Sequence, residues 1–219
     1  IRLAEFLFRQ TGDPAYMHYI EYNVQNGIFA QTYGPNGGLL TYFLPMKAGS
    51  KKDWAGRRDT FFCCHGTMVQ ANASWNRRLY YQDADKLYVA SYANSDVEFE
   101  VNGQNVKLVQ RQDMLNGSMM TCSENNTKQT VNDIAAAYAN RPDFRKYDFV
   151  VNTDSDVAFT LLLRIPDWIK ADACVYVNDE LVEKTSVTDR FVSIDRTWKN
   201  GDKVVLTLPI GLDFVTLPD

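Results

Sequence analysis

Residues 97–110 read VEFEVNGQNVKLVQ, and this stretch carries the clearest structural signal in the chain. Apolar and polar residues alternate on both sides of Asn102-Gly103, which is the pattern of two strands that each have one buried face. Asn-Gly suits the two-residue turn of a β-hairpin, because both residues of that turn take positive φ. The stretch therefore predicts strands at 97–101 and 106–110, joined as an antiparallel hairpin.

Other segments around this hairpin have the same short length and the same enrichment in β-branched and aromatic residues. Turn signals separate them, namely Pro166-Asp167, Asn178-Asp179 and Asn200-Gly201-Asp202. We expect strands at 87–92, 158–165, 174–177, 191–194 and 204–208. Many short strands with turns between them predict a mostly antiparallel β-sandwich.

The first 26 residues have helical periodicity instead, beginning with Leu3, Phe6 and Leu7. Thr11-Gly12 is a helix stop, and Asp13-Pro14 supplies an N-cap and a proline for the first turn of a second helix. Asn26-Gly27 is expected to close this helical hairpin. A strand is expected within 39–45.

A third helix is expected over residues 67–80, since five residues recur there at helical spacing. These residues are Met68, Ala71, Asn72, Trp75 and Leu79. Together these patterns predict an α+β chain with a helical part at 1–82 and a β-sandwich at 83–219. A polar insertion is expected at 121–148, with a short helix at 131–139. Because the chain opens inside a helical pattern, we expect it to be a piece of a longer protein.

Composition narrows the class of partner. The 219 residues carry a net charge of −4 with scattered Lys and Arg, which argues against nucleic acid as a partner. No apolar run is long enough to span a membrane. Four cysteines do not make a disulfide framework, and Cys174 is expected to be a small buried residue. We expect a small or neutral ligand, and the sequence does not decide the oligomeric state.

Cys63 and Cys64 stand side by side in residues 61–67, FFCCHGT. Neighbouring side chains of a strand point to opposite faces, so the two thiols do not suit one core. A helix N-terminus at this place lowers a thiol pKa, which favours a reactive or zinc-bound thiolate pair. Two buried thiols at a helix start remain the alternative. His65 is a candidate ligand or base, but we favour a hydrogen bond to the local turn.

Glu21 and Tyr42 are the other candidates for a binding site. Glu21 lies on a helical face that otherwise carries Tyr and Ile, where an inward carboxylate needs a hydrogen-bonding partner. Tyr42 offers a hydroxyl and a flat apolar ring, which suits a sugar. A surface acid and a core tyrosine are the alternative interpretations.

Two groups of motifs occur in order along the chain. The first comprises Ile20-Glu21 with Asn26-Gly27, then residues 41–45, TYFLP, and then FCCHGT at 62–67. It resembles the closing part of the catalytic domain of the bacterial β-L-arabinofuranosidases, glycoside hydrolase family 127 and its close relatives. The second comprises LRIPDW at 163–168, VNDE at 177–180 and RTWKNGDKV at 196–204. It resembles the β-sandwich that follows that domain.

The resemblance implies that the helices are the C-terminal helices of an (α/α)6 barrel, followed by the β-sandwich. It implies a retaining hydrolase of terminal β-L-arabinofuranosides from plant-type oligosaccharides or glycosides. Cys63 matches the nucleophile and a zinc ligand, Cys64 matches a second zinc ligand, and Glu21 and Tyr42 match residues that contact the sugar.

In that family the acid/base glutamate and the remaining zinc ligands precede the position of Ile1. The resemblance therefore implies that this chain alone is inactive and binds zinc weakly or not at all. The rival interpretation is a non-catalytic carbohydrate-binding or structural β-sandwich module, in which the helices are a linker and the cysteines are merely buried.

Overall fold

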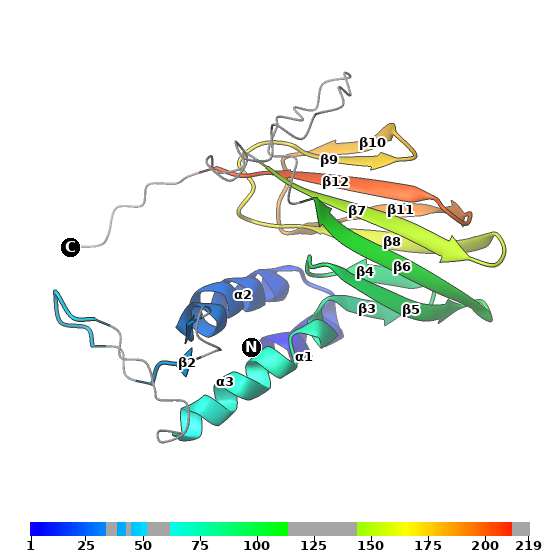
Figure 1. The fold of residues 1–219 in the computed structure, drawn as a ribbon. Helices are drawn as coiled ribbons and strands as arrows, with labels where there is room; N and C mark the ends of the chain where they lie inside the picture. The colour runs from blue at the N-terminus through cyan, green and yellow to red at the C-terminus, as the bar shows by residue number, and fades with distance from the viewer. Residues whose placement is uncertain (34–38, 43–44, 52–61, 114–143, 212–219) are drawn as a thin grey trace, which may run out of the picture. The chain divides into compact units, whose positions relative to one another are not determined.

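The computed structural model describes residues 1–33, 39–42, 45–51, 62–113 and 144–211 (Figure 1). The chain forms two compact units, Ile1–Leu79 and Tyr80–Asp219. The first contains the helices and the second contains the two main sheets. The helix expected at 131–139 and most of the insertion expected at 121–148 lie outside the described residues.

The predicted helical hairpin is present at the start of the first unit. Helix α1 (Arg2–Thr11) and helix α2 (Ala15–Asn23) contact each other. Gly12 joins them with φ 70°, and its N–H donates to the Phe8 carbonyl over 2.7 Å. The Asp13 carboxylate accepts the Ala15 N–H at 2.9 Å, as the N-cap prediction requires.

The prediction that Asn26-Gly27 closes the hairpin is wrong. The chain continues through a π-helical turn, η1 (Val24–Ile28), and a 3-10 turn, η2 (Phe29–Gln31). The Asn26 side-chain amide donates to the Tyr22 carbonyl at 2.9 Å, so it supports the helical path instead of ending it. Strands β1 (Thr32–Tyr33) and β2 (Leu39–Leu40) then pair antiparallel. Of the strand expected at 39–45, residues 39–40 form β2, the described residues 41, 42 and 45 lie in no strand, and residues 43–44 lie outside the described residues.

Helix α3 (Cys63–Ala73) begins four residues earlier than the expected range of 67–80, and a 3-10 turn, η3 (Asn76–Arg78), follows it. The conventional N-cap residues Ser, Thr, Asp and Asn are absent at this end. Instead, the His65 N–H donates to the Phe62 carbonyl at 3.0 Å, and the Phe62 N–H donates to His65 Nδ1 at 3.1 Å. His65 thus takes the place that Glu has in a capping box.

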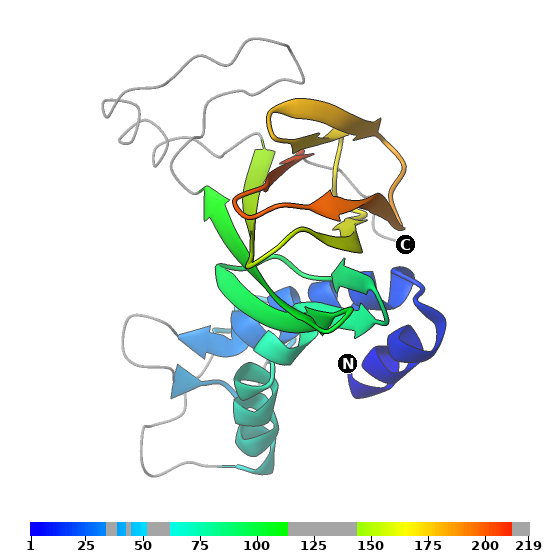
Figure 2. The ribbon, with the colours of Figure 1, turned by 90° about the vertical axis from the view of Figure 1, so that its right-hand side faces the viewer.

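The second unit is built from two sheets that enclose a common core (Figures 1 and 2). Its strands are β3 (Tyr80–Asp83), β4 (Lys86–Val89), β5 (Ser95–Val101), β6 (Gln104–Asp113), β7 (Phe144–Thr153), β8 (Val157–Ile165), β9 (Ala173–Val177), β10 (Glu180–Thr185), β11 (Arg190–Trp198) and β12 (Lys203–Pro209). The larger sheet has the order β10-β9-β12-β7-β6-β5, and the smaller has the order β11-β8-β4-β3. Among the described pairs of these strands, β4 and β8 alone run parallel, so the expected antiparallel pattern is confirmed.

The turns of the second unit follow the sequence signals. Asn102 and Gly103 have φ of 53° and 75° between β5 and β6, and Asn178 and Asp179 have φ of 50° and 68° between β9 and β10. Both pairs thus have the two positive φ angles that a type I′ turn requires. Cys174 in β9 is buried as expected, but it is disulfide-bonded and not a free thiol.

Asp202 anchors the turn between β11 and β12. Its Oδ2 accepts the Lys199 N–H at 2.9 Å, and its Oδ1 accepts the Asn178 side-chain amide at 2.8 Å. Burial raises the pKa of Asp202, but these two hydrogen bonds and the Arg196 charge outweigh it and hold that pKa below its usual range. The folded state therefore favours the ionised carboxylate.

Replacement of Asp202 by asparagine should make the stability of the second unit less sensitive to acid. Because the folded pKa lies below the unfolded one, the carboxylate stabilises the fold above the unfolded pKa of about 3.9, and this contribution is lost as the pH falls further. We expect the variant to be less stable near pH 7 by about 1–3 kcal/mol and to lose less between pH 5 and pH 2.5. Urea denaturation at several pH values measures both effects. Asp195→Asn, at an exposed position of β11, is the matched control and should keep the wild-type slope.

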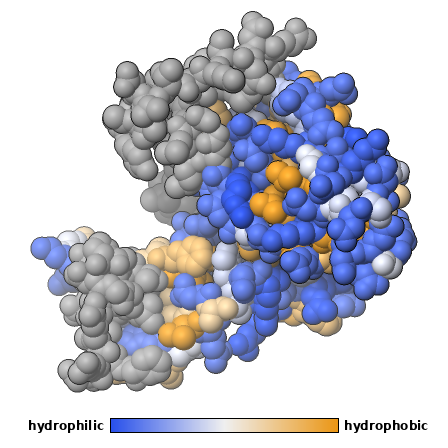
Figure 3. All heavy atoms as spheres, turned by 45° about the vertical axis from the view of Figure 1, so that its right-hand side comes forward, coloured by the Kyte–Doolittle hydropathy of each residue, from blue (hydrophilic) through white to orange (hydrophobic). Residues whose placement is uncertain are grey.

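Several large apolar side chains of the helical unit are exposed. The expected face of α1 differs from the observed one: Ala4 and Phe8 are buried together with Glu5, whereas Leu3 and Phe6 are exposed. Figure 3 shows hydrophobic patches on a face that is otherwise mostly hydrophilic.

In the described part of the chain, no helix is long and apolar enough to cross a membrane.

Candidate active site

The two thiols lie in the first turn of α3. Cys63 and Cys64 occupy the first two helical positions, both side chains are exposed, and both are free thiols. Consecutive residues of a helix are turned by only about 100° from each other, so both sulfurs can lie on the same side of this turn. The two Sγ atoms are 3.8 Å apart. The alternative of two buried thiols is wrong for these residues.

Tyr42 lies beside the thiols, although twenty residues separate it from Cys63 in sequence. Its hydroxyl is within hydrogen-bonding reach of both sulfurs. Its ring lies 4.5 Å from the Phe62 ring and 5.8 Å, edge to face, from the His65 ring, measured between centroids. Two of the residues that flank the cysteine pair therefore also position the tyrosine.

The thiols and the phenol influence one another's ionisation. The negative charges of the Cys63 and Cys64 thiolates raise the pKa of Tyr42, and hydrogen bonds to the same sulfurs act in the same direction. Tyr42 therefore keeps its proton and can donate it in a hydrogen bond to sulfur.

Cys64 differs from the sequence-based expectation of a lowered thiol pKa. Its hydrogen bond with Cys63 raises the pKa of Cys64, partial desolvation and the charge of Cys63 add to this, and the hydrogen bond from Tyr42 opposes it. In the absence of a metal ion, the Cys64 thiol therefore holds its proton more tightly than an isolated cysteine does.

The spacing of the two sulfurs fits a shared metal ion. With Zn–S bonds of about 2.3 Å at tetrahedral angles, two thiolate ligands of one zinc lie roughly 3.8 Å apart. The observed Sγ–Sγ distance is also 3.8 Å. In residues 1–33, 39–42, 45–51, 62–113 and 144–211, no group of three His, Cys, Asp or Glu side chains is arranged to hold a metal ion. The two thiols would therefore supply two ligands to such an ion.

His65 and Glu21 have different places in the helical unit. His65 is buried, and its Nδ1 accepts the Phe62 N–H, which confirms the expected hydrogen bond to the local turn. Glu21 lies in α2 next to the buried Ile20 and is partly exposed. Its role as a sugar ligand stays a prediction.

A buried ion pair ties the far end of α3 to α1. Arg78 of η3 donates from Nε to Glu5 at 2.9 Å and from Nη1 to the Ser74 carbonyl at 2.8 Å. Arg77 lies 3.3 Å from the same carboxylate. This ion pair leaves no signal in the sequence, because Glu5 is more than 70 positions from both arginines and only the packed helices bring them together.

Phe62 is the site residue that the sequence analysis missed. Its ring packs on Tyr42 and its backbone caps the helix that carries the thiols. The available signal was its position directly before the cysteine pair, since the residue before a helix fixes the direction of the first turn.

Comparison with known families matches both units of the chain. The model of the GH127 β-L-arabinofuranosidase catalytic domain matches residues 1–77, and the model of the GH127 middle domain matches residues 123–210. No curated protein sequence matches the chain.

Solved structures share the fold. A GH127 β-L-arabinofuranosidase from Geobacillus stearothermophilus T6 is 24% identical with a TM-score of 0.69. A glycoside hydrolase is 20% identical with a TM-score of 0.67, and a GH127 β-arabinofuranosidase is 23% identical with a TM-score of 0.62. The matches cover 94%, 94% and 92% of this chain and 30% of each solved chain. The chain thus spans about a third of the length of the structures that it resembles.

Proposed function

Because the chain belongs to glycoside hydrolase family 127, the family of the β-L-arabinofuranosidases, we propose that it is the C-terminal part of a retaining glycoside hydrolase. The intact protein removes terminal β-L-arabinofuranosyl groups from plant-type oligosaccharides or glycosides. Cys63 is its nucleophile, zinc is held in part by Cys63 and Cys64, and Glu21 and Tyr42 bind the sugar.

The observation that carries this proposal is the cluster of Tyr42, Cys63 and Cys64. The residues come from two separate segments of the matched catalytic-domain region, yet the tyrosine hydroxyl reaches both sulfurs. Both thiols are exposed, as a nucleophile must be if it is to reach a substrate. A purely structural pair has no need of this exposure.

The proposed reaction proceeds in two displacements. In the first, the Cys63 sulfur forms a bond to the anomeric carbon while the glycosidic C–O bond breaks, and a carboxylic acid protonates the leaving oxygen. In the second, water attacks the same carbon, the C–S bond breaks, and the carboxylate takes the proton of the water. Two inversions at one carbon give net retention.

Zinc fits the sulfur spacing described above. A bound zinc ion keeps a coordinating thiol deprotonated at neutral pH. Of the residues of this chain, Cys63 and Cys64 would hold the ion in the intact protein, and the phenol of Tyr42 is placed to donate a hydrogen bond toward the sulfurs or a sugar hydroxyl. This division of roles agrees with a tyrosine that keeps its proton beside two thiolates.

The chain alone is proposed to be inactive and to bind zinc weakly or not at all. Its described residues would provide two thiolate ligands of the metal site. On the family resemblance, we assign the acid/base glutamate and the remaining ligands to a segment that precedes Ile1 in the intact protein. The helices belong to an (α/α)6 barrel in this proposal. Apolar side chains exposed on α1 and α2, such as Leu3 at 71% and Tyr22 at 70%, are the surfaces that further barrel helices would cover.

Product stereochemistry tests the proposal. NMR of the full-length protein acting on 4-nitrophenyl β-L-arabinofuranoside should show the β-anomer of free arabinose before mutarotation. The 219-residue chain, measured in parallel, should release no nitrophenol. Initial release of the α-anomer would contradict the retaining mechanism. Binding of an oligosaccharide with a terminal β-L-arabinofuranosyl group by the full-length protein, without any hydrolysis, would favour the rival, a carbohydrate-binding module.

A further inference from the structure

A hollow of about 560 Å³ lies in the second unit, at the ends of β5, β6 and β7. Register pairs Glu98 with Lys107 and Lys107 with Asn152, so these three side chains form one row across the outer face of the sheet. Glu100 and Asn105 form the next row, with Asp154 just beyond the end of β7. The hollow is within the size range of ligand sites in proteins, which is roughly 300–1,000 Å³.

Lys107, Thr153 and Asn200 of this hollow are engaged within the protein, by Asp96, by the Ser155 carbonyl and by the Thr153 N–H respectively, but its other polar side chains are not. In the part of the chain that the structure describes, the side chains of Glu98, Glu100, Asn105, Asn152 and Asp154 make no hydrogen bond or ion pair. These five side chains present carboxylate acceptors and amide groups that both donate and accept. They come from three neighbouring strands and converge on one concavity.

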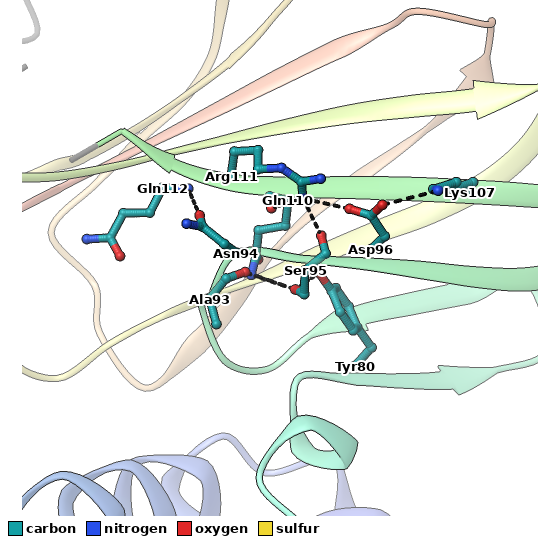
Figure 4. Close-up of polar contacts among 9 residues, drawn as sticks. All are labelled: Tyr80, Ala93, Asn94, Ser95, Asp96, Lys107, Gln110, Arg111 and Gln112. Carbon is teal, nitrogen blue, oxygen red and sulfur yellow. Dashed lines mark hydrogen bonds and ion pairs between the residues drawn. The ribbon is translucent and has the colours of Figure 1, made fainter. Parts of the chain in front are cut away.

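On the adjoining part of the same sheet face, charged side chains form ion pairs with one another. Asp96 binds Arg111 at 2.6 Å and Lys107 at 3.1 Å, and Lys203 binds Asp148 at 3.3 Å. Figure 4 shows Asp96 between Lys107 and Arg111, within a network that extends to Ser95 and Tyr80. The charges there are already paired, so the unpaired polar groups are a property of the hollow and not of the whole face.

The charge of the hollow narrows the ligand class. Three carboxylates face one ammonium group, that of Lys107, and Asp96 already engages it, which disfavours phosphate and other anions. No group of three His, Cys, Asp or Glu side chains among the described residues is arranged for a metal ion. Sugar hydroxyls donate and accept at once, so they complement a mixture of carboxylates and amides.

We propose that this hollow is a binding site for a neutral glycan on the β-sandwich. Neighbouring rows lie about 7 Å apart along the strands and neighbouring strands about 4.8 Å apart, which matches contacts to one or two sugar units. The choice of an arabinose-containing glycan rests on the proposed function. In that case the sandwich holds the polymer whose terminal residue is cleaved.

Affinity electrophoresis in gels that contain neutral arabinan tests the site. Full-length protein with Cys63→Ala, which leaves the polymer intact, should be retarded. Adding Glu98→Ala and Asn152→Ala should weaken the retardation constant about tenfold, as expected for the loss of several modest hydrogen bonds. The matched control, Glu180→Ala at an exposed position of β10 in the same sheet, should have no effect. Circular dichroism verifies that each variant is folded.

The outcomes separate this inference from the proposed function. In the Cys63→Ala protein, equal retardation of the Glu98→Ala, Asn152→Ala variant and the Glu180→Ala control overturns the glycan site, and so does the absence of any retardation. Retardation by the cationic glycan chitosan alone also overturns it, because that result means charge attraction. When Cys63 is kept, the protein with only Glu98→Ala and Asn152→Ala should hydrolyse the small nitrophenyl glycoside at the wild-type rate. If the Cys63→Ala protein is retarded but neither this protein nor the wild type hydrolyses the glycoside, the result contradicts the proposed function and leaves the glycan site supported.

Discussion

The Cys63→Ala variant of the full-length protein is expected to hydrolyse 4-nitrophenyl β-L-arabinofuranoside about 10⁴-fold more slowly than the wild type, or slower still. Removing a nucleophile abolishes the covalent pathway, and the remaining rate comes only from binding and electrostatic groups. Steady-state measurement of kcat/KM checks this. The fold should be preserved, since the side chain is exposed and its contacts are with Cys64 and Tyr42.

Two further variants identify the origin of that loss. Tyr42→Phe removes the hydroxyl that reaches the sulfurs but keeps the ring that packs on Phe62, so a much smaller reduction is expected. Val69→Ala lies on the same helix and should leave kcat/KM unchanged. A Cys63→Ala variant with near-normal kcat/KM would show that the nucleophile lies elsewhere.

Trp198→Ala should have the largest effect on stability. The Trp198 side chain is fully buried in the sandwich, its ring stacks on Phe159 with centroids 5.4 Å apart, and its Nε1 donates to the Phe159 carbonyl at 2.9 Å. Truncation leaves a large cavity and an unpaired carbonyl, so we expect a loss of about 3–5 kcal/mol in the free energy of unfolding.

Urea denaturation followed by far-UV circular dichroism measures this loss without depending on tryptophan fluorescence. Trp198→Phe retains most of the apolar volume and loses the hydrogen bond, so its cost should be clearly smaller. Thr197→Ala, at the exposed neighbouring position, should change stability by less than about 0.5 kcal/mol. A Trp198→Ala protein as stable as Thr197→Ala would contradict the assignment of Trp198 to the core.

The parts of the fold that could be predicted from the sequence are those fixed by local chemistry. The β5–β6 hairpin followed from alternation around Asn102-Gly103, and the α1–α2 turn followed from Gly12 and Asp13, because each signal acts within a few residues. The start of α3 was placed too late, since its cap is a histidine side chain and not one of the usual N-cap residues.

Other elements depend on tertiary context. Strands β3, β7 and β10 were not expected, and the first five residues of β7 fall at the end of the range expected to be an insertion. In β10, Leu181 and Val182 are both exposed, so the sequence shows no alternation between a buried and an exposed face. Such strands form because pairing and packing with neighbouring strands of the sheet stabilise them.

The candidate site also combines a feature that is visible in the local sequence with features that depend on the folded chain. The cysteine pair was visible in the sequence, but its contact with Tyr42 depends on how the segment at 41–42 returns to the start of α3. The pKa of Cys64 also depends on this arrangement, because the neighbouring sulfur outweighs the favourable position at a helix start. A local motif thus predicted a reactive pair of thiols, and the folded structure determines the surroundings of that pair.

We propose that Cys63 is the nucleophile of a glycoside hydrolase. Peptide mapping by mass spectrometry, after the full-length protein reacts with an electrophilic epoxide analogue of L-arabinofuranose, tests this assignment directly. We expect one covalent label per protein, located on Cys63 and formed in step with the loss of hydrolysis. A label on another residue, with Cys63 unmodified in fully inactivated protein, would contradict it.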